Sequence, residues 1–456
     1  MSKSRMGTAV AVASVMALAS VSLSTAEATS VAPSRSNAVL RWNAYAGEAA
    51  VAACLSPVTN PLHESRMYAI THVAVHDALQ AIRRTSEPYA FDARVRFTSA
   101  RAAVSGAAHT ALVGVLEDMS GVLEPACLGS ALEIVDGGYA RMTGKLPDSP
   151  RTERGLNLGE RAATAILELR RRDGSETPLV VADFPQGDEP GEWRFTPERP
   201  FAFAPGWGDV EPFGLVQPDQ FRPRPPHPVV SRAYARDLRQ VKRLGSDGVS
   251  YPSARTEEQT EIALFWVESS PLSWNRLGRS LASDNGLDRW ESARLFALLN
   301  IAMADGYIAS FDTKYQDRFW RPVTAVRRAG WDGNPRTVPD RDWIPLVTTP
   351  PIPDHDSAHA VEGGAAASVF EGFFGTDAMS FEVCSGTVPA GGQCSDPAPV
   401  SRSFDSFRHA ARENAISRVL VGFHFRHAAR AGLRHGHRIG DWTVDSLLRS
   451  DLGRAA

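Results

Sequence analysis

Cations, hydroxyls and imidazoles occur in three separate runs of the sequence, KYQDRFWRP, HDSAHAVEGG and SRVLVGFHF. The side chains in these runs that could do chemistry are, in order, Lys314, Arg321, Ser357, His359, Arg418 and His424. A lysine ammonium and two arginine forks can pair with the oxygens of an anion. An imidazole can transfer a proton, attack a central atom or ligate it. This set of side chains predicts a pocket for phosphate or for an anion of the same shape.

Helices must bring these runs together, because apolar residues recur at helical spacing through most of the chain. One helix is expected over residues 294–320, with Lys314 near its end. A second is expected over residues 358–373, with Asp356 or Ser357 as its N-cap. The serine and the first N–H groups of that helix would then meet an anion at the positive end of the helix dipole.

The third run is expected to lie in a single helix over residues 408–430. Arg418 and His424 are six residues apart in it, which is more than one helical turn. The two side chains would therefore reach one anion only if the anion lay against that face of the helix.

The order K-x6-RP, S-x-H, SR-x5-H resembles the three-part signature shared by type 2 phosphatidic acid phosphatases and vanadium-dependent haloperoxidases. The runs GEWRFTP, PFG and RTEEQTEIALFW also resemble bacterial vanadium haloperoxidase-like proteins. The resemblance extends over about residues 39–448, and it implies vanadate as the cofactor.

The resemblance also implies a role for each residue of the three runs. The groups expected to hold the anion's oxygens are the side chains of Lys314, Arg321, Ser357 and Arg418 and the backbone N–H of Ala358. His359 would be the acid–base residue. His424 would bond the central atom, either as the axial ligand of vanadium or as the nucleophile that forms a phosphohistidine.

Four positions depart from the family's motifs, namely Ile352, Asp356, Ala358 and Ala428. The middle run reads DSAH where the usual motif is PSGH, and its Asp356 would either weaken oxyanion affinity or cap the helix. The phosphatases often place an aspartate four residues after the last histidine, where this chain has Ala428, so another group, such as a backbone carbonyl, must orient His424. Chloroperoxidases carry an aromatic residue five positions before the motif serine. This chain has Ile352 there, which leaves the halide preference open.

The fold class expected from these patterns is all-α, because strand signals are sparse. We expect two packed helical bundles, with the oxyanion site in the C-terminal one. The expected divisions are a signal peptide over residues 1–28, an N-terminal helical bundle over 29–178, an ordered crossover rich in proline and aromatic residues over 179–230, and a C-terminal bundle over 231–450. The last three are expected to form one compact unit.

One helical sequence is echoed later in the chain. RMYAITHVAVHDA, from residue 66, aligns without gaps with RLFALLNIAMADG, from residue 294, and the alignment matches Asp77 with Asp305. Either two related bundles or two buried helices that converged on similar packing would explain it. His72 and His76 are expected in the core or behind the site, because the second copy has no histidine at these positions.

Composition and targeting signals set the expected compartment. Two basic residues, an apolar segment over about residues 7–23 and the run Ala-Glu-Ala ending at Ala28 indicate a secretory signal peptide. No other run approaches the roughly 20 apolar residues of a membrane span. The formal net charge of -3 gives no support to nucleic-acid binding. The protein is therefore expected to be secreted and to have no membrane span.

Four cysteines in an exported chain favour disulfides over a metal site. Cys384 and Cys394 flank a loop with glycine and proline and are expected to pair, which leaves Cys54 and Cys127 for the second bond. Free buried thiols are the alternative. The histidines at 427, 435 and 437 are expected at the surface or at helix ends, since no cysteine or carboxylate pattern accompanies them.

Three functions remain open. The first is a vanadium-dependent haloperoxidase that uses hydrogen peroxide to oxidise a halide, which then reacts with a small organic substrate. The second is an exported acid phosphatase, in which His424 attacks a phosphate ester and His359 protonates the leaving group. The third is a non-catalytic relative that binds an oxyanion. The organic substrate and the oligomeric state do not follow from the sequence.

Overall fold

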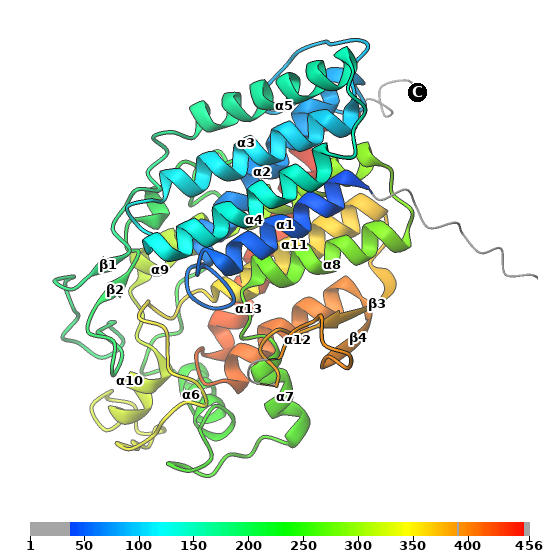
Figure 1. Cartoon of the computed structure of the whole chain (residues 1–456). Coiled ribbons are helices and arrows are strands. Elements are labelled where there is room, and N and C mark those ends of the chain that lie inside the picture. Colours follow the sequence, from blue (N-terminus) through cyan, green and yellow to red (C-terminus); the bar gives the residue numbers. More distant parts are fainter. Residues whose placement is uncertain (1–36, 390–391, 451–456) are drawn as a thin grey trace, which may run out of the picture. The chain divides into compact units, whose positions relative to one another are not determined.

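The computed structural model describes residues 37–389 and 392–450, so the expected signal peptide over residues 1–28 lies outside the described residues. The helices are α1 Ala38–Ala52, α2 Pro61–Ile82, α3 Ala100–Asp118, α4 Pro125–Thr143, α5 Pro150–Leu169, α6 Arg232–Leu244, α7 Glu257–Phe265, α8 Ser270–Asp284, α9 Arg289–Asp317, α10 Pro322–Arg327, α11 Ala358–Phe374, α12 Phe407–Leu420 and α13 Arg426–Ser446, with a 3-10 turn η1 at Trp207–Asp209 (Figure 1). Two short antiparallel ribbons accompany them in the described part of the chain, β1 Val180–Val181 with β2 Ala202–Phe203 and β3 Ala378–Cys384 with β4 Ser401–Ser406. The all-α fold class is confirmed.

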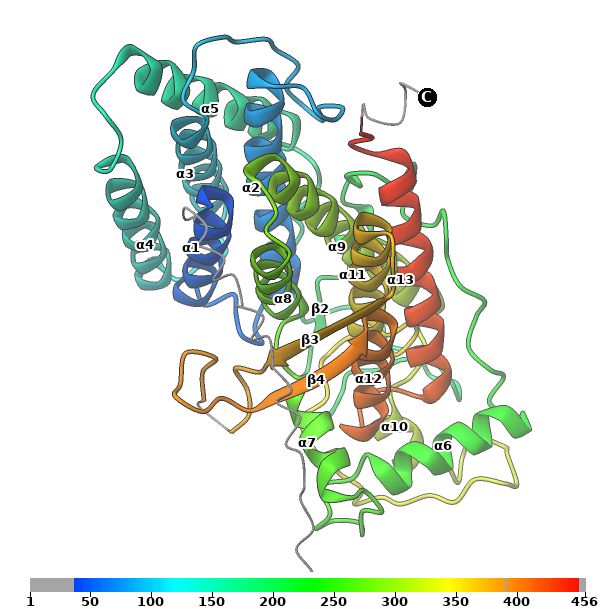
Figure 2. The same cartoon turned by 90° about the vertical axis from the view of Figure 1, so that its right-hand side faces the viewer.

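Helix α2 lies at the centre of the packing. Every residue from Leu62 to Ala81 is buried, which is possible only because other helices cover all its faces. Helix α2 packs on α3 and α9, α9 packs on α11, and α11 packs on α13 (Figure 2). The N-terminal helices are thus continuous with the helices that carry the three predicted runs.

Helix α9 is the one helix, among residues 37–389 and 392–450, that is long and apolar enough to cross a membrane. Its 29 residues begin at a capping box formed by Asp288 and Glu291. In the most apolar window of this helix, 94% of the residues are buried inside the protein. Burial of this kind is the property of a core helix.

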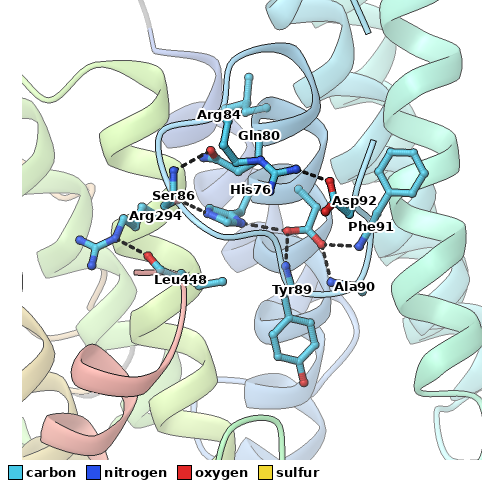
Figure 3. Close-up of polar contacts among 12 residues, drawn as sticks. His76, Gln80, Arg84, Ser86, Tyr89, Ala90, Phe91, Asp92, Arg294 and Leu448 are labelled. Atoms are coloured by element: carbon cyan, nitrogen blue, oxygen red, sulfur yellow. Dashed lines mark hydrogen bonds and ion pairs between the residues drawn. The ribbon is translucent and has the colours of Figure 1, made fainter. Parts of the chain in front are cut away.

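Helices α2 and α9, whose sequences are similar, have aspartates at equivalent positions, and each aspartate accepts hydrogen bonds from the backbone of a loop. Asp77 accepts hydrogen bonds from the backbone N–H groups of Tyr89, Ala90 and Phe91 at 2.6–2.9 Å (Figure 3). Asp305 accepts hydrogen bonds from the N–H groups of residues 213–215, also at distances from 2.6 to 2.9 Å. Each helix therefore fixes a loop through one buried carboxylate, at positions that the alignment of the two segments matches.

His72 and His76 lie in the core, as predicted, and both are fully buried. His76 is 3.0 Å from the carboxylate of Asp77 through Nδ1 and 2.9 Å from Ser86 Oγ through Nε2 (Figure 3). This order of serine, histidine and aspartate is that of a hydrolase triad. Here the arrangement of Ser86, His76 and Asp77 has a structural role, because all three side chains are buried and Asp77 already holds a loop.

Small residues bring α11 and α13 into close contact. A Cβ on Gly436 would lie 1.9 Å from the carbonyl oxygen of Val361, and one on Gly364 would lie 2.4 Å from that of Leu433. Larger residues at these positions would push the two helices apart. The close contact sets the position of the start of α11 relative to α13.

The single helix expected over residues 408–430 is wrong. Helix α12 ends at Leu420, and α13 begins at Arg426. Gly422 between them has φ 89°, and a Cβ there would lie 2.4 Å from the carbonyl oxygen of Gly245, so only glycine suits the position. The N–H groups of Phe423 and His424 both return to the carbonyl of Arg418 at 3.1 Å. This turn, and not a helical face, brings His424 back beside Arg418.

The segment over residues 179–230 is ordered and mostly irregular. Trp193 and Trp207 are each 1% exposed, and the N–H of Trp193 donates to the carbonyl of Arg318 at 2.6 Å. Tyr315 on α9 donates its hydroxyl to the carbonyl of Phe203 at 2.6 Å. The segment is therefore tied to the end of the helix that carries Lys314. The boundaries expected between residues 29–178, 179–230 and 231–450 remain a prediction.

Both expected disulfides are formed, Cys54 with Cys127 and Cys384 with Cys394. The second bond closes a loop between β3 and β4, whose ends lie in register at Cys384 and Ser401. The alternative of free thiols is wrong, because none of the cysteines is free.

Candidate oxyanion site

Lys314 lies in the last turn of α9 with no exposed surface. Its ammonium donates to the backbone carbonyls of Pro353 at 3.0 Å and Asp354 at 3.1 Å, and also to that of Asp356. Burial and the neighbouring Arg321 lower the pKa of Lys314 to about 7, against the opposing effect of two carboxylates. The lysine thus organises the loop that leads into α11.

Arg321 is the N-cap of α10 and is fully buried. Its Nε donates to the carbonyl of Ile352 at 2.7 Å, and its Nη1 donates to that of Phe423 at 2.9 Å. Among the described residues its Nη2 has no hydrogen-bond partner. Burial lowers the pKa of Arg321 to about 10, so the group remains a cation at neutral pH.

Arg418 lies in the last turn of α12 and is 3% exposed. Its Nη1 donates to the carbonyl of Trp266 at 2.7 Å, while its Nε has no partner within the described part of the chain. Burial, and then the charge of Arg321, lower the pKa of Arg418 to about 9. This second guanidinium is also charged at neutral pH and has donor capacity left over.

Ser357 is the N-cap of α11, and its side chain makes no capping hydrogen bond. Its Oγ is buried and has no partner among residues 37–389 and 392–450. Its own N–H donates to the carbonyl of Ala428 at 3.2 Å. Ala358 is the first residue of the helix, where the backbone N–H has no acceptor within the helix. Both predicted donors therefore stand at the helix start.

His424 is oriented by a residue that the sequence analysis missed. The Nδ1 of His424 lies 3.0 Å from the Oδ1 of Asp354, so a side-chain carboxylate and not a backbone carbonyl holds the ring. Nε2 of His424 lies 2.9 Å from Nη1 of Arg321 and accepts from it. Asp354 stands three residues before Ser357, and this proximity in sequence was the signal that could have identified it.

Burial raises the pKa of Asp354 to about 7, against the opposing charges of Arg321 and Lys314. The pKa of His424 is lowered well below its usual range by burial and by Arg321, Lys314, Arg418 and His359. The imidazole is therefore neutral at pH 7. A neutral ring that donates through Nδ1 has its lone pair on Nε2, the form needed to ligate or attack.

His359 is the second residue of α11, and its Nε2 is buried and without a partner among the described residues. Burial and the charge of Arg418 lower its pKa well below the usual range, and a hydrogen bond with the backbone of Glu268 acts in the opposite direction. The ring is neutral and has one nitrogen available for proton exchange.

Asp356 does neither of the two things expected of it. Its carboxylate accepts a hydrogen bond from Ser310 at 2.7 Å and lies 2.8 Å from His435 Nδ1, so it neither caps α11 nor offers a free charge to an anion. Burial raises its pKa, but His435, His355 and Lys314 outweigh burial and the pKa is lowered overall. His435 is 1% exposed, so its expected place at the surface or a helix end is wrong.

The structure brings the three runs to one place. Lys314 and Arg321 both contact the loop before α11, and Arg321 also contacts His424. The groups that act on the pKa of His424 come from all three runs. The buried polar atoms without a hydrogen-bond partner in the described chain include one from each of four predicted site residues, namely Arg321 Nη2, Ser357 Oγ, His359 Nε2 and Arg418 Nε. Such a set of orphaned atoms is expected where a polar ligand belongs.

The C-terminal part of the chain matches a known domain. The vanadium chloroperoxidase second helical-bundle domain matches residues 294–450, which contain every predicted site residue. Vanadium chloroperoxidase of Curvularia inaequalis is 26% identical over 472 residues, which cover 82% of this chain and 76% of that protein. The chain is related to the vanadium-dependent haloperoxidases. The resemblance stated from the motifs is thus confirmed.

Solved structures of vanadium haloperoxidases have the same fold. A bacterial vanadium-dependent iodoperoxidase aligns with a TM-score of 0.72 and 24% identity over 91% of this chain and 97% of that chain. The holo form of a bacterial vanadium-dependent chloroperoxidase aligns with a TM-score of 0.65 and 17% identity over 89% of this chain and 96% of that chain. At these identities the likeness concerns the fold.

A second domain family, the RES domain, matches residues 140–275. This stretch begins in α4 and ends in α8. The alignment with the iodoperoxidase leaves out only 9% of the chain, so it must include most of this stretch. Most of residues 140–275 therefore share the fold of the vanadium haloperoxidases.

Proposed function

We propose that the protein is a vanadium-dependent haloperoxidase, which binds vanadate at His424 and uses hydrogen peroxide to oxidise a halide. The observation that carries this proposal is the donor set around His424. Two buried guanidiniums, a serine hydroxyl and a second imidazole each keep an unpartnered polar atom there, within the described chain. The relationship to vanadium chloroperoxidase supports the same assignment.

The residues present suit vanadate. A four-oxygen anion needs hydrogen-bond donors and positive charge, which Lys314, Arg321 and Arg418 supply, and it needs one neutral nitrogen ligand. Asp354 keeps the hydrogen of His424 on Nδ1 and so leaves Nε2 as that ligand. Ser357 Oγ and the N–H of Ala358 would add donors at the positive end of α11.

Bound vanadate would supply Lewis-acid activation of peroxide towards a halide. Around it, the cations hold the anionic charge and restrict its orientation. His359 holds or releases a proton at Nε2, which is the polar atom of this ring without a partner in the described chain. Arg321 must give up its hydrogen bond with His424 Nε2 when that nitrogen becomes a ligand.

The purified protein should be assayed with and without vanadate for peroxide-dependent halogenation of a phenolic dye, with chloride, bromide and iodide in parallel. The three halides are needed because relatives include both iodoperoxidases and chloroperoxidases, and because Ile352 departs from the chloroperoxidase motif. We expect activity that requires vanadate with at least one halide.

His424→Ala should abolish this activity, and His409→Ala is the matched control because His409 lies on α12 and is exposed. Robust hydrolysis of phosphate esters without halogenation would contradict the haloperoxidase proposal and would identify the protein as an acid phosphatase. Vanadate binding without either activity would contradict both enzymatic functions and would indicate a non-catalytic relative that binds an oxyanion.

We also propose that the protein is exported and that its first 28 residues are removed. The two disulfides support an oxidising compartment. Expression with the native start in a bacterial host, followed by N-terminal sequencing of the extracytoplasmic fraction, should give a chain that begins at Thr29. A chain that keeps its first residues in the reducing cytoplasm would contradict the proposal.

A further inference from the structure

Four arginines form a stripe along α13. Arg426, Arg430, Arg434 and Arg438 are spaced by four residues, so they project from one face of the helix at steps of about 6 Å. The last three are exposed. No acidic residue occurs in the sequence over residues 426–440. The stripe is a concentrated positive charge in a chain whose formal net charge is -3.

Like charges at this helical spacing repel one another. Carboxylates within the described chain do not relieve the repulsion, since none forms an ion pair with these four arginines. Arg438 instead lies over the ring of Phe221, 4.6 Å from its centroid. A helix that keeps four such charges side by side is suited to an anionic partner from outside.

Two cavities border the stripe. One of about 660 Å³ lies between α13 and the end of the crossover and is lined by Arg224, Arg434 and Arg438. The other, of about 370 Å³, lies between α13 and α6 and is lined by Arg236, Arg426 and Arg430. His227 and His427 line both, with ring centroids 4.1 Å apart. We call the two cavities together the basic groove.

The acidic groups near the groove are already engaged. Asp237 lines the smaller cavity, and its Oδ2 accepts the backbone N–H of His427 at 3.0 Å. The larger cavity has no acidic lining residue. At its wall stands His435, which is 1% exposed and whose Nε2 has no partner among the described residues. An unpartnered ring nitrogen in a residue that lines a cavity is an independent sign of a polar ligand.

We propose that the basic groove binds a linear polyanion of the acidic polysaccharide class, whose sulfate or carboxylate groups pair with the arginine forks. The repeated spacing of the stripe and the two joined cavities suit a chain with repeated charges better than a single small anion. Arginine presents two parallel donors to each such group.

A single-stranded nucleic acid or a lipid surface suits the groove less well. Single-stranded nucleic acid needs free aromatic faces on which its bases stack. Apart from the histidines, the aromatic lining residue is Phe221, whose ring is occupied by Arg438 and lies 6.1 Å from that of Trp442. A membrane surface needs exposed apolar anchors beside the charges, and the two disulfides favour a compartment outside the cytoplasm.

The test uses the full chain and four probes, namely heparin, polygalacturonate, DNA of both strand types, and vesicles with anionic lipid. Binding is measured as a function of salt for the wild type, for the triple variant Arg430→Gln, Arg434→Gln, Arg438→Gln, and for a control that removes the exposed arginines 94, 96 and 151. Both variants lose the same charge. We expect the groove variant to bind the polysaccharides about tenfold more weakly, and the control to bind as the wild type does.

A second measurement needs no variant. Heparin should protect Arg430, Arg434 and Arg438 of the wild type from modification by phenylglyoxal, as mapped by mass spectrometry. Equal weakening in both variants, tighter binding to DNA or to vesicles, or a lack of protection would each overturn the proposal. Because the groove contains none of the residues proposed to hold vanadate, these outcomes do not depend on halogenating activity.

Discussion

The ring of His424 is held by a carboxylate from the loop before α11. Asp354 lies in the loop that Lys314 organises through three backbone carbonyls, so the position of the carboxylate depends on the lysine. Arg321 contacts both the same loop, at Ile352, and the ring itself. These residues therefore act as one unit, and substitutions at them are expected to be non-additive.

Asp354→Asn should weaken vanadate binding by about 10- to 100-fold, because an amide no longer fixes the hydrogen of His424 on Nδ1. Titration calorimetry with vanadate measures the change. Asp332→Asn is the matched control, since Asp332 is 3% exposed and accepts hydrogen bonds from Asn334 and Thr337 in another loop. Unchanged affinity in the Asp354 variant would contradict its orienting role.

Vanadate affinity should fall as the pH rises above about 7. Burial and Arg321 lower the pKa of Lys314 to about 7, so the ammonium loses its charge above this pH and an anion loses one partner. Lys314→Met should bind weakly throughout and show a smaller pH dependence, the remainder of which comes from Asp354, whose pKa is also about 7. Affinity measured from pH 6 to 9 in both proteins decides the point, and parallel curves would argue against the lysine as the titrating group.

Two central helices, α2 and α9, use the same device at equivalent positions. Each has a buried aspartate that accepts three consecutive backbone N–H groups from a loop, which lies 12–14 residues away in sequence for Asp77 and 90–92 residues away for Asp305. Convergence on buried packing explains shared small and large apolar residues, but it does not require the same hydrogen-bonding pattern. The observation favours two related bundles over convergence.

Asp305→Ala should lower the free energy of unfolding by about 3–5 kcal/mol, since it leaves two buried N–H groups and one part-buried N–H group without an acceptor. Urea denaturation measures the loss. Limited proteolysis should then cut within residues 213–230, which Asp305 normally fixes. Asp77→Ala is the matched comparison. It should cost a similar free energy but expose residues 89–91, and identical cleavage patterns in the two variants would refute separate roles.

At the scale of the whole molecule, the N-terminal and C-terminal helices meet around buried carboxyls. Glu64 on α2 accepts a hydrogen bond from Ser269 at the start of α8. Glu362 on α11 is fully buried, and burial and the nearby Glu64 raise its pKa well above the usual range. Neutral carboxyls in this contact make the association of the helices sensitive to pH.

Burial raises the pKa of Glu64 from 4.5 to about 7. Between these values the unfolded chain releases the proton while the folded chain keeps it, so this group's contribution to stability is lost as the pH rises. Relative to Glu64→Gln, the wild type should lose about 3 kcal/mol of unfolding free energy between pH 4.5 and pH 7. Denaturation of both proteins across this range measures the difference, and a constant difference would contradict the assignment.

The sequence by itself determined most of the helices and the order of the three motif runs, and it favoured the disulfide pairing that the structure shows. Helical periodicity, N-cap residues and the loop between Cys384 and Cys394 are local features, and local features can be read from neighbouring residues. The sequence also marks two of the helix ends at the site, since Pro322 follows Lys314 and Ser357 is an N-cap residue, but the helix end after Arg418 was not predicted.

The tertiary structure alone decided how these residues cooperate. The break after α12 depends on the close contact of Gly422 with Gly245, which are far apart in sequence. Asp356 is withdrawn from the anion by His435, a partner 79 positions away, and Asp354 reaches His424 across 70 positions. Such pairings are set by which helices pack together, and the spacing of residues along the chain does not encode them.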